Sequence, residues 1–145
     1  MAKAKKLKKT VTWWKKKVWK VFSEYIRLRD ALNTTGSPHT LRCCSCGKPY
    51  PAFGVGCAQA GHFIPGRHNS ILFSEHCVHG QCYNCNINLY GNTLEYRRRI
   101  IEMYGDGYDE VLEQEDRRIK KFTRQELEEM KIDLKAKIKA LTDGE

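Results

Sequence analysis

Two Cys-x-x-Cys pairs, Cys43/Cys46 and Cys82/Cys85, carry the strongest chemical signal in the sequence. Zn²⁺ prefers four thiolate or imidazole ligands in a tetrahedron, and two intervening residues let both sulfurs of a pair face one ion. Disulfides and free thiols are the alternatives. No secretory signal precedes the cysteines, and this spacing suits a metal better than a structural bridge. The pattern therefore predicts a structural zinc site.

His62 and Asn86 are residue types that hydrolysis of a phosphodiester could use. An imidazole can take the proton of an attacking water, while a divalent ion neutralises the phosphate and assists the leaving 3′ oxygen. His62 lies between the cysteine pairs, which favours a functional role over that of a merely packed histidine. Asn86 follows Cys85 directly, and its amide oxygen is a hard ligand suited to Mg²⁺ or Mn²⁺. Capping of a helix is the alternative role for Asn86.

The order of these segments resembles the HNH (ββα-metal) endonucleases, and among them the Rap/NinG branch of phage recombination nucleases. The likeness covers about residues 22–104. It depends on the whole ordered set: Cys-x-x-Cys, Gly-His-Phe-Ile-Pro, His-Gly-Gln-Cys-x-x-Cys-Asn and Gly-Asn. The resemblance implies that His62 is the general base and that Asn86 binds the catalytic metal. Asn86 lies nine residues after Cys77, which is the spacing between the second and third letters of the HNH signature.

Two positions depart from the wider family. Gly61 stands where many relatives have the first metal-binding Asp or His, and Cys77 stands at the middle Asn position. We expect His79 to replace the missing ligand, with His68 as the second choice. Structural support is the alternative role for His79. Gly-His and the histidine before Gly-Gln-Cys also occur in the Rap/NinG pattern, so Cys77 is the more serious departure.

Three cysteines remain outside the predicted zinc site. Cys44 could compete with Cys43, but only one residue separates it from Cys46. Cys57 and Cys77 are expected to be small buried apolar residues. A second zinc site is disfavoured because it would consume the proposed base; its ligands would be Cys57, His62, Cys77 and His79.

Charge is distributed unevenly along this chain of net charge +9. Residues 1–100 contain 17 Lys and Arg against 4 Asp and Glu, whereas residues 101–145 contain 9 against 13. A basic amino-terminal half suits a phosphate backbone, although a lysine run can also be a solvated tail and an arginine run a solvated helix face. The residues that we expect to contact DNA are Lys15, Lys16, Lys17, Arg67, Arg97 and Arg98.

The predicted fold class is α+β, a small zinc-stapled ββα-metal core of the treble-clef-like HNH type with helices at both ends. The expected segments are a flexible basic arm (1–10), an N-terminal helix (11–33), the nuclease core (41–104) and a helical extension (105–145). Within the core we expect antiparallel strands over 59–64 and 74–79, joined by a loop. The tryptophans of the first helix are expected in the core, with stacking on bases as the alternative. A core this small makes zinc a large contributor to folding.

The C-terminal helix has a marked start and an apolar seam. Thr123 and Glu126 form the pattern of a capping box. The seam either folds back on the domain, which we favour slightly, or pairs with a second copy of the chain in a homodimer. Its residues are Leu127, Met130, Leu134, Ile138 and Leu141. A further helix is predicted over 108–121.

The sequence is therefore interpreted as a DNA endonuclease that carries structural Zn²⁺ and uses Mg²⁺ or Mn²⁺. By resemblance, its substrates are branched recombination intermediates such as Holliday junctions or D-loops. We expect no membrane partner, because no apolar run reaches the roughly 18 residues of a span, and we expect a cytoplasmic location, in the host cell if a phage encodes the chain. The alternatives are a non-catalytic zinc-finger DNA-binding protein and an interaction protein that uses the C-terminal seam.

Overall fold

The computed structural model describes residues 8–144, and its longest helix, α1 (Val11–Thr35), contacts both hairpins and the last helix. Thr10 caps the start of α1, because its Oγ1 accepts a hydrogen bond from the backbone N–H of Trp13 at 3.1 Å. Gly36 ends the helix in the left-handed conformation, at φ 77°. The predicted basic arm falls largely on residues 1–7, which lie outside the described residues.

Two antiparallel hairpins follow α1. The first pairs β1 (Thr40–Arg42) with β2 (Pro49–Pro51), and the second pairs β3 (Gln59–His62) with β4 (Val78–Gln81). The prediction of a strand over 74–79 was wrong in its bounds. The backbone N–H of Cys77 bonds to Ser74 in a turn, so extended pairing starts only at Val78.

The connection between β3 and β4 also differs from the predicted loop. It contains the short helix α2 (Asn69–Leu72), which buries Ile71 and Leu72 against the core. The helical turn buries these two apolar side chains, and α2 also contacts the later helix that runs over residues 108–116. The predicted strand over 59–64 ends two residues early, at His62.

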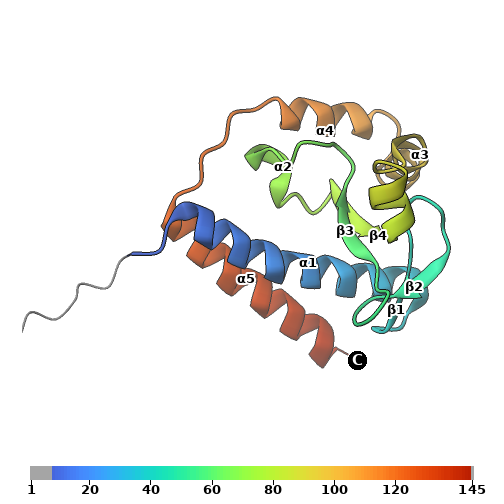
Figure 1. Ribbon diagram of the computed structural model, residues 1–145, viewed down its shortest axis with the longest axis horizontal. Helices are drawn as coiled ribbons and strands as arrows, with labels where there is room; N and C mark the ends of the chain where they lie inside the picture. The colour runs from blue at the N-terminus through green and yellow to red at the C-terminus, as the bar shows by residue number, and fades with distance from the viewer. Residues whose placement is uncertain (1–7, 145) are drawn as a thin grey trace, which may run out of the picture.

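The second cysteine pair leads into helical structure. A single π-helical segment, η1 (Asn84–Asn88), is followed by α3 (Thr93–Tyr104), which Gly105 ends with φ 102°. Next comes α4 (Tyr108–Asp116), five residues shorter than the predicted helix. Figure 1 shows α4 on the side of the β3–β4 hairpin opposite α1.

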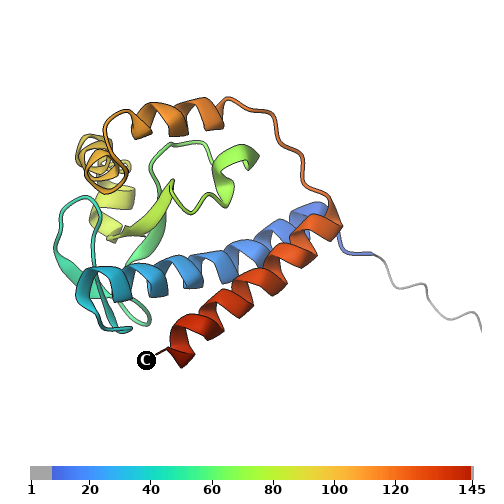
Figure 2. The same cartoon turned by 180° about the vertical axis from the view of Figure 1, so that it is seen from behind.

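The last helix, α5 (Arg124–Asp143), folds back on α1, and the two run side by side in the same direction (Figures 1 and 2). Leu127 and Leu134 of the seam are buried there. Half of the predicted capping box forms: Thr123 Oγ1 accepts the N–H of Glu126 at 3.1 Å, while the Glu126 carboxylate pairs with Lys120.

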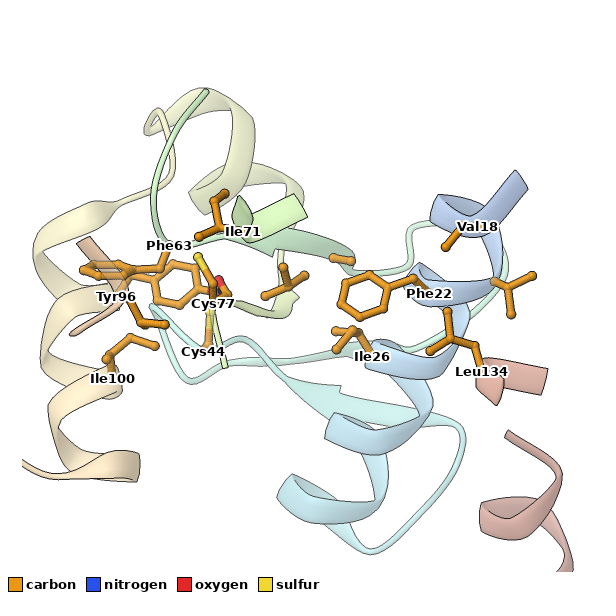
Figure 3. Packing of buried hydrophobic residues seen from close by; sticks show 14 of the residues in the cluster. Val18, Phe22, Ile26, Cys44, Phe63, Ile71, Cys77, Tyr96, Ile100 and Leu134 are labelled. Atoms are coloured by element: carbon orange, nitrogen blue, oxygen red, sulfur yellow. Dashed lines mark hydrogen bonds between the residues drawn. The ribbon is translucent and has the colours of Figure 1, made fainter. Parts of the chain in front are cut away.

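A continuous apolar core joins α1 and α5 to α3 beneath the second hairpin. Figure 3 shows Phe22 and Ile26 of α1 near Leu134 at one end, and Tyr96 of α3 near Phe63 at the other. Cys43, Cys82 and Cys85 form a separate buried cluster with Tyr50. None of the helices within residues 8–144 has the length and apolarity to cross a membrane.

Candidate functional site

The four predicted zinc ligands come together at one point between the turn after β1 and the start of η1. The Sγ atoms of Cys43, Cys46, Cys82 and Cys85 lie within 4.8 Å of one another, and those of Cys46 and Cys82 are 3.9 Å apart. A tetrahedron with Zn–S bonds of about 2.3 Å has S···S edges of about 3.8 Å. All seven cysteines are free thiols. The spacing therefore fits a four-thiolate metal centre rather than disulfides.

The backbone around this centre favours thiolates. The N–H groups of Ser45, Cys46 and Cys82 point at Cys43 Sγ from 3.3 to 3.5 Å. Hydrogen bonding from the Cys44 thiol, and then from the backbone, lowers the pKa of Cys43 to about 4. Burial raises the pKa of Cys44 well above its ordinary value, so Cys44 stays a thiol beside the centre.

His62 stands at the end of β3 with one ring nitrogen committed to a hydrogen bond. Its Nε2 lies 3.1 Å from the carbonyl oxygen of Leu72. A carbonyl can only accept, so Nε2 carries the hydrogen and Nδ1 of the neutral ring carries a lone pair. Trp19 stacks on the imidazole at 5.2 Å with 16° between the ring planes. Burial, and to a lesser degree the charge of Arg67, lower the His62 pKa and favour the neutral ring.

His62 and Asn86 line the same cavity, of about 270 Å³. Its buried floor includes Ala60 and Phe63, and its exposed rim includes Arg67. The Arg67 guanidinium lies 4.4 Å from the Trp19 ring centre, on the residue that also stacks on His62. No carboxylate of the described residues lines this cavity. The site therefore presents an imidazole, an amide and a cation without a competing anion.

Asn86 lies within η1 and makes no side-chain helix cap. Its Nδ2 donates to Gln59 Oε1 at 2.7 Å, and Oδ1 accepts no hydrogen bond from the described residues. The backbone N–H of Asn86 bonds to the carbonyl oxygen of Cys82 at 2.9 Å. The second cysteine pair thus fixes Asn86 and leaves its amide oxygen available to a ligand.

His79 does not join His62 and Asn86. It pairs across the hairpin with Gly61, so its side chain lies on the face of the sheet opposite that of His62. Its two ring nitrogens contact the hydroxyls of Tyr96, at 3.1 Å, and Tyr104, at 2.8 Å. This arrangement matches structural support, the alternative role for His79, and gives no support to the expected role as metal ligand.

Packing accounts for both departures from the wider family. A Cβ atom on Gly61 would lie 2.2 Å from Gln81 Oε1, so position 61 has no room for a metal-binding side chain. Gln81 is buried and held by Nε2 hydrogen bonds to Ser45 and Gly91. Cys77 is fully buried, as expected for a small apolar residue. Cys57 is only half-buried, with Arg27 Nη1 3.7 Å from its sulfur.

The structure also places His68, the second choice for the missing ligand, and the residues of the disfavoured second zinc site. His68 is exposed and its Nδ1 lies 2.8 Å from Asp116 Oδ1, so it faces α4. Among residues 8–144, the four-cysteine cluster is the only group of three or more metal-binding side chains within reach of one ion. The set containing Cys57 and Cys77 therefore does not come together.

The predicted DNA contacts differ in their availability. Lys16 and Lys17 are exposed and Lys15 is half-buried on α1. Arg97 is bound by two carboxylates of α4, those of Asp109 and Glu113, which compete with a phosphate for its guanidinium. Arg98 is exposed, with its guanidinium 2.7 Å from the neighbouring Glu95 on the same helix.

Sequence reasoning missed a basic segment between α4 and α5. Arg117, Arg118 and Lys120 are exposed and line a groove of about 620 Å³, which Arg67 also lines. The run Arg-Arg-Ile-Lys-Lys (117–121), which contains no acid, was the available signal of a basic surface. Arg67 lines both this groove and the His62 cavity.

A larger cavity of about 670 Å³ lies against the other face of the second hairpin. It is lined by His79, by arginines that include Arg29 and Arg99, and by the carboxylates of Asp30 and Glu75. Arg29 is paired with Asp30 at 2.8 Å. Its mixed charge suits a phosphate less well than the carboxylate-free cavity at His62.

The protein family described as Bacteriophage Lambda NinG protein matches residues 1–145, the whole chain. The chain belongs to the NinG family. This NinG-family chain is 29% identical over 134 residues to the protein ninG of Salmonella phage P22. The match covers 92% of this chain and 60% of the phage P22 protein, so the chain spans about three fifths of that relative. No solved structure matches the NinG-family chain.

Proposed function

We propose that this NinG-family chain is a divalent-metal-dependent DNA endonuclease of the HNH type that acts on branched DNA in phage recombination. One observation carries the proposal: His62, whose Nδ1 carries a lone pair, and Asn86, whose Oδ1 accepts no hydrogen bond from the described residues, line the same carboxylate-free cavity as Arg67. A general base, a hard ligand and a cation are the groups that phosphodiester hydrolysis needs.

The local fold supports this assignment. His62 ends the first strand of an antiparallel hairpin, and Asn86 lies in the helical turn that follows the second strand. This is the strand, strand, helix order of a ββα-metal motif. The four-cysteine centre holds the start of η1 and thereby Asn86. A structural zinc here would fix the catalytic groups as well as the fold.

Each residue has a defined part in the proposed reaction. His62 Nδ1 takes the proton of the attacking water, and the hydrogen bond from Nε2–H to Leu72 keeps the ring oriented. Arg67 contacts a phosphate oxygen beside the scissile bond. Asn86 Oδ1 would hold the divalent ion, whose chemistry is to neutralise the phosphate and assist the leaving oxygen.

The donor set defines how a catalytic ion can be bound. Mg²⁺ sites usually include one or two carboxylates, and the described lining of this cavity offers none. One amide oxygen binds a hard cation weakly, so DNA phosphate oxygens and water would supply the remaining ligands. The residues fit an ion that binds together with DNA rather than an ion held by the free protein.

The test is nicking of supercoiled plasmid and of a synthetic four-way junction in Mg²⁺ or Mn²⁺. We expect activity in the wild type, its loss in His62→Ala, and a higher metal requirement in Asn86→Ala. His39→Ala is the matched control, because His39 is exposed and lies outside the cavity. Binding of DNA without nicking in any divalent metal would instead establish the competing function, a zinc-containing DNA-binding protein without catalysis.

A further inference from the structure

Three non-glycine residues in the described chain have left-handed backbones, and two of them line the His62 cavity. They are Arg67 (φ 51°), Tyr90 (φ 50°) and Asn92 (φ 42°). Arg67 and Tyr90 lie on the cavity rim. This conformation is uncommon for a bulky residue such as Tyr90 and persists only where surrounding structure enforces it. The strain is therefore concentrated at the proposed active site.

The second cysteine pair enforces the conformation of the turn that carries Tyr90. The N–H of Gly91 bonds to the carbonyl oxygen of Cys85 at 2.9 Å, and Asn92 Nδ2 donates to Cys85 Sγ at 3.4 Å. From the other side, Gln81 Nε2 donates to the carbonyl oxygen of Gly91 at 2.7 Å. The backbone at Tyr90 is thus tied to a metal-binding residue and to β4.

The fixed backbone presents Tyr90 to solvent. The residue is 91% exposed, and its hydroxyl makes no hydrogen bond to the described residues. Ile87, on the same rim, is 46% exposed. A solvent-exposed ring on a fixed backbone, beside an apolar side chain, offers a flat stacking surface.

The charges around this surface indicate what the ligand must carry. Arg67 is on the same rim, and no described carboxylate lines the cavity. Lys15 and Lys16 precede Trp19, another lining residue, by four and three positions, so they lie on the same face of α1. A flat, apolar group attached to an anion matches both features, and a nucleobase with its phosphate is such a group.

We propose that Tyr90 stacks on an unpaired nucleobase next to the phosphate bound at His62, which makes a strand leaving a duplex the preferred DNA. Bases inside a B-form duplex are already stacked on one another and do not offer a free face to the ring. A fork or junction does offer one. This inference rests on the proposed function and names the substrate feature that the site reads.

The test uses the zinc-containing full chain and a synthetic fork with 2-aminopurine at the first unpaired position, without added Mg²⁺ or Mn²⁺. We expect the wild type and Tyr90→Phe to quench the fluorescence on binding. Tyr90→Ala should lose the quenching and bind the fork about tenfold more weakly, with duplex affinity within about twofold of the wild type. Tyr83→Ala is the matched control, because Tyr83 is 56% exposed on the same segment and does not line the cavity.

The outcomes separate this inference from the nuclease assignment. Quenching that depends on Tyr90 in a protein that cuts no DNA would support stacking and refute catalysis. Unchanged fork binding and quenching in Tyr90→Ala would overturn the stacking role even if the protein cuts DNA, and would assign the exposed ring to another partner, such as a protein. Equal weakening of fork and duplex binding would also overturn it, since Tyr90 would then not read the unpaired base.

Discussion

The hydroxyl of Tyr96 connects His79 to the strand that carries His62. It donates to the carbonyl oxygen of Gly61 at 2.6 Å and therefore accepts from Nδ1 of His79, 3.1 Å away. His79 Nε2 then accepts the hydroxyl hydrogen of Tyr104. Burial favours the neutral ring, and in that ring this arrangement places the hydrogen on Nδ1. His79 thus supports β3 from behind the proposed active site.

This buried ring makes stability sensitive to acid. Burial lowers the pKa of His79 to about 4, against an ordinary value near 6.5, so the unfolded chain binds a proton first as pH falls. The stability from His79 is complete above about pH 6.5 and is lost as pH falls toward 4, a change of about 3 kcal/mol. Urea unfolding at pH 7 and pH 4.5 measures it. His79→Asn should be less stable at pH 7 and lose less on acidification; an equal loss in both proteins would contradict the assignment.

Removal of the metal should unfold the core. The four sulfurs lie within 4.8 Å of one another, and the small surrounding core needs the energy of metal binding. We expect about one zinc per chain by elemental analysis and a large drop in melting temperature on treatment with a strong chelator. Cys82→Ser should resemble the chelated protein, whereas Cys57→Ser should retain the zinc. An apo protein with full thermal stability would show that these cysteines do not form a structural metal centre.

The pH profile of cleavage should report His62. Its lowered pKa keeps the ring neutral and able to act as a base at pH 6.5, so the rate should fall only below that pH. Arg67 contributes to the lowering, so Arg67→Ala should raise the His62 pKa and shift the acidic limb of the profile upward. Single-turnover rates across pH 5 to 8 test this. An acidic limb that does not move in Arg67→Ala would show that the limb does not report the protonation of His62.

The salt dependence of DNA binding should distinguish arginines that contact DNA phosphates from arginines that are paired with carboxylates of the protein. Arg117 and Arg118 are exposed on the groove that Arg67 shares, so the double alanine variant should lower the slope of log K against log salt by up to about 2. Arg97→Gln should leave the slope unchanged and lower the melting temperature, because Arg97 pairs with Asp109 and Glu113. Fluorescence anisotropy over a salt series measures both. An unchanged slope in the double alanine variant, together with a lower slope in Arg97→Gln, would place the phosphate contacts on α3.

The sequence was sufficient to predict the metal-binding part of the site, which depends on local spacing. Two residues between paired cysteines constrain where their sulfurs point, and the four sulfurs do meet. The resemblance to HNH endonucleases paired His62 with Asn86, and both line one cavity. The α5 seam was recognised because its period matches a helix face, and it folds back on α1.

Other features depend on contacts between distant segments and could not be predicted. The glycine at position 61 is explained by Gln81, twenty residues later, whose amide fills the space of a Cβ. The role of His79 depends on tyrosines of α3. The exposure of Tyr90 depends on a turn held by Cys85 and Gln81. Such packing leaves no periodic trace in the sequence.

The most direct test of the central claim is the Mn²⁺-dependent cleavage of an end-labelled four-way junction by wild type and His62→Ala under single-turnover conditions, with and without added imidazole. We expect cleavage by the wild type, a rate lower by roughly 10² or more in His62→Ala, and partial recovery of that variant with imidazole. Zinc content and junction affinity should match the wild type in the same samples. Cleavage by His62→Ala at the wild-type rate would contradict the assignment of His62 as the base, and a wild type that binds the junction but never cuts it would contradict the nuclease itself.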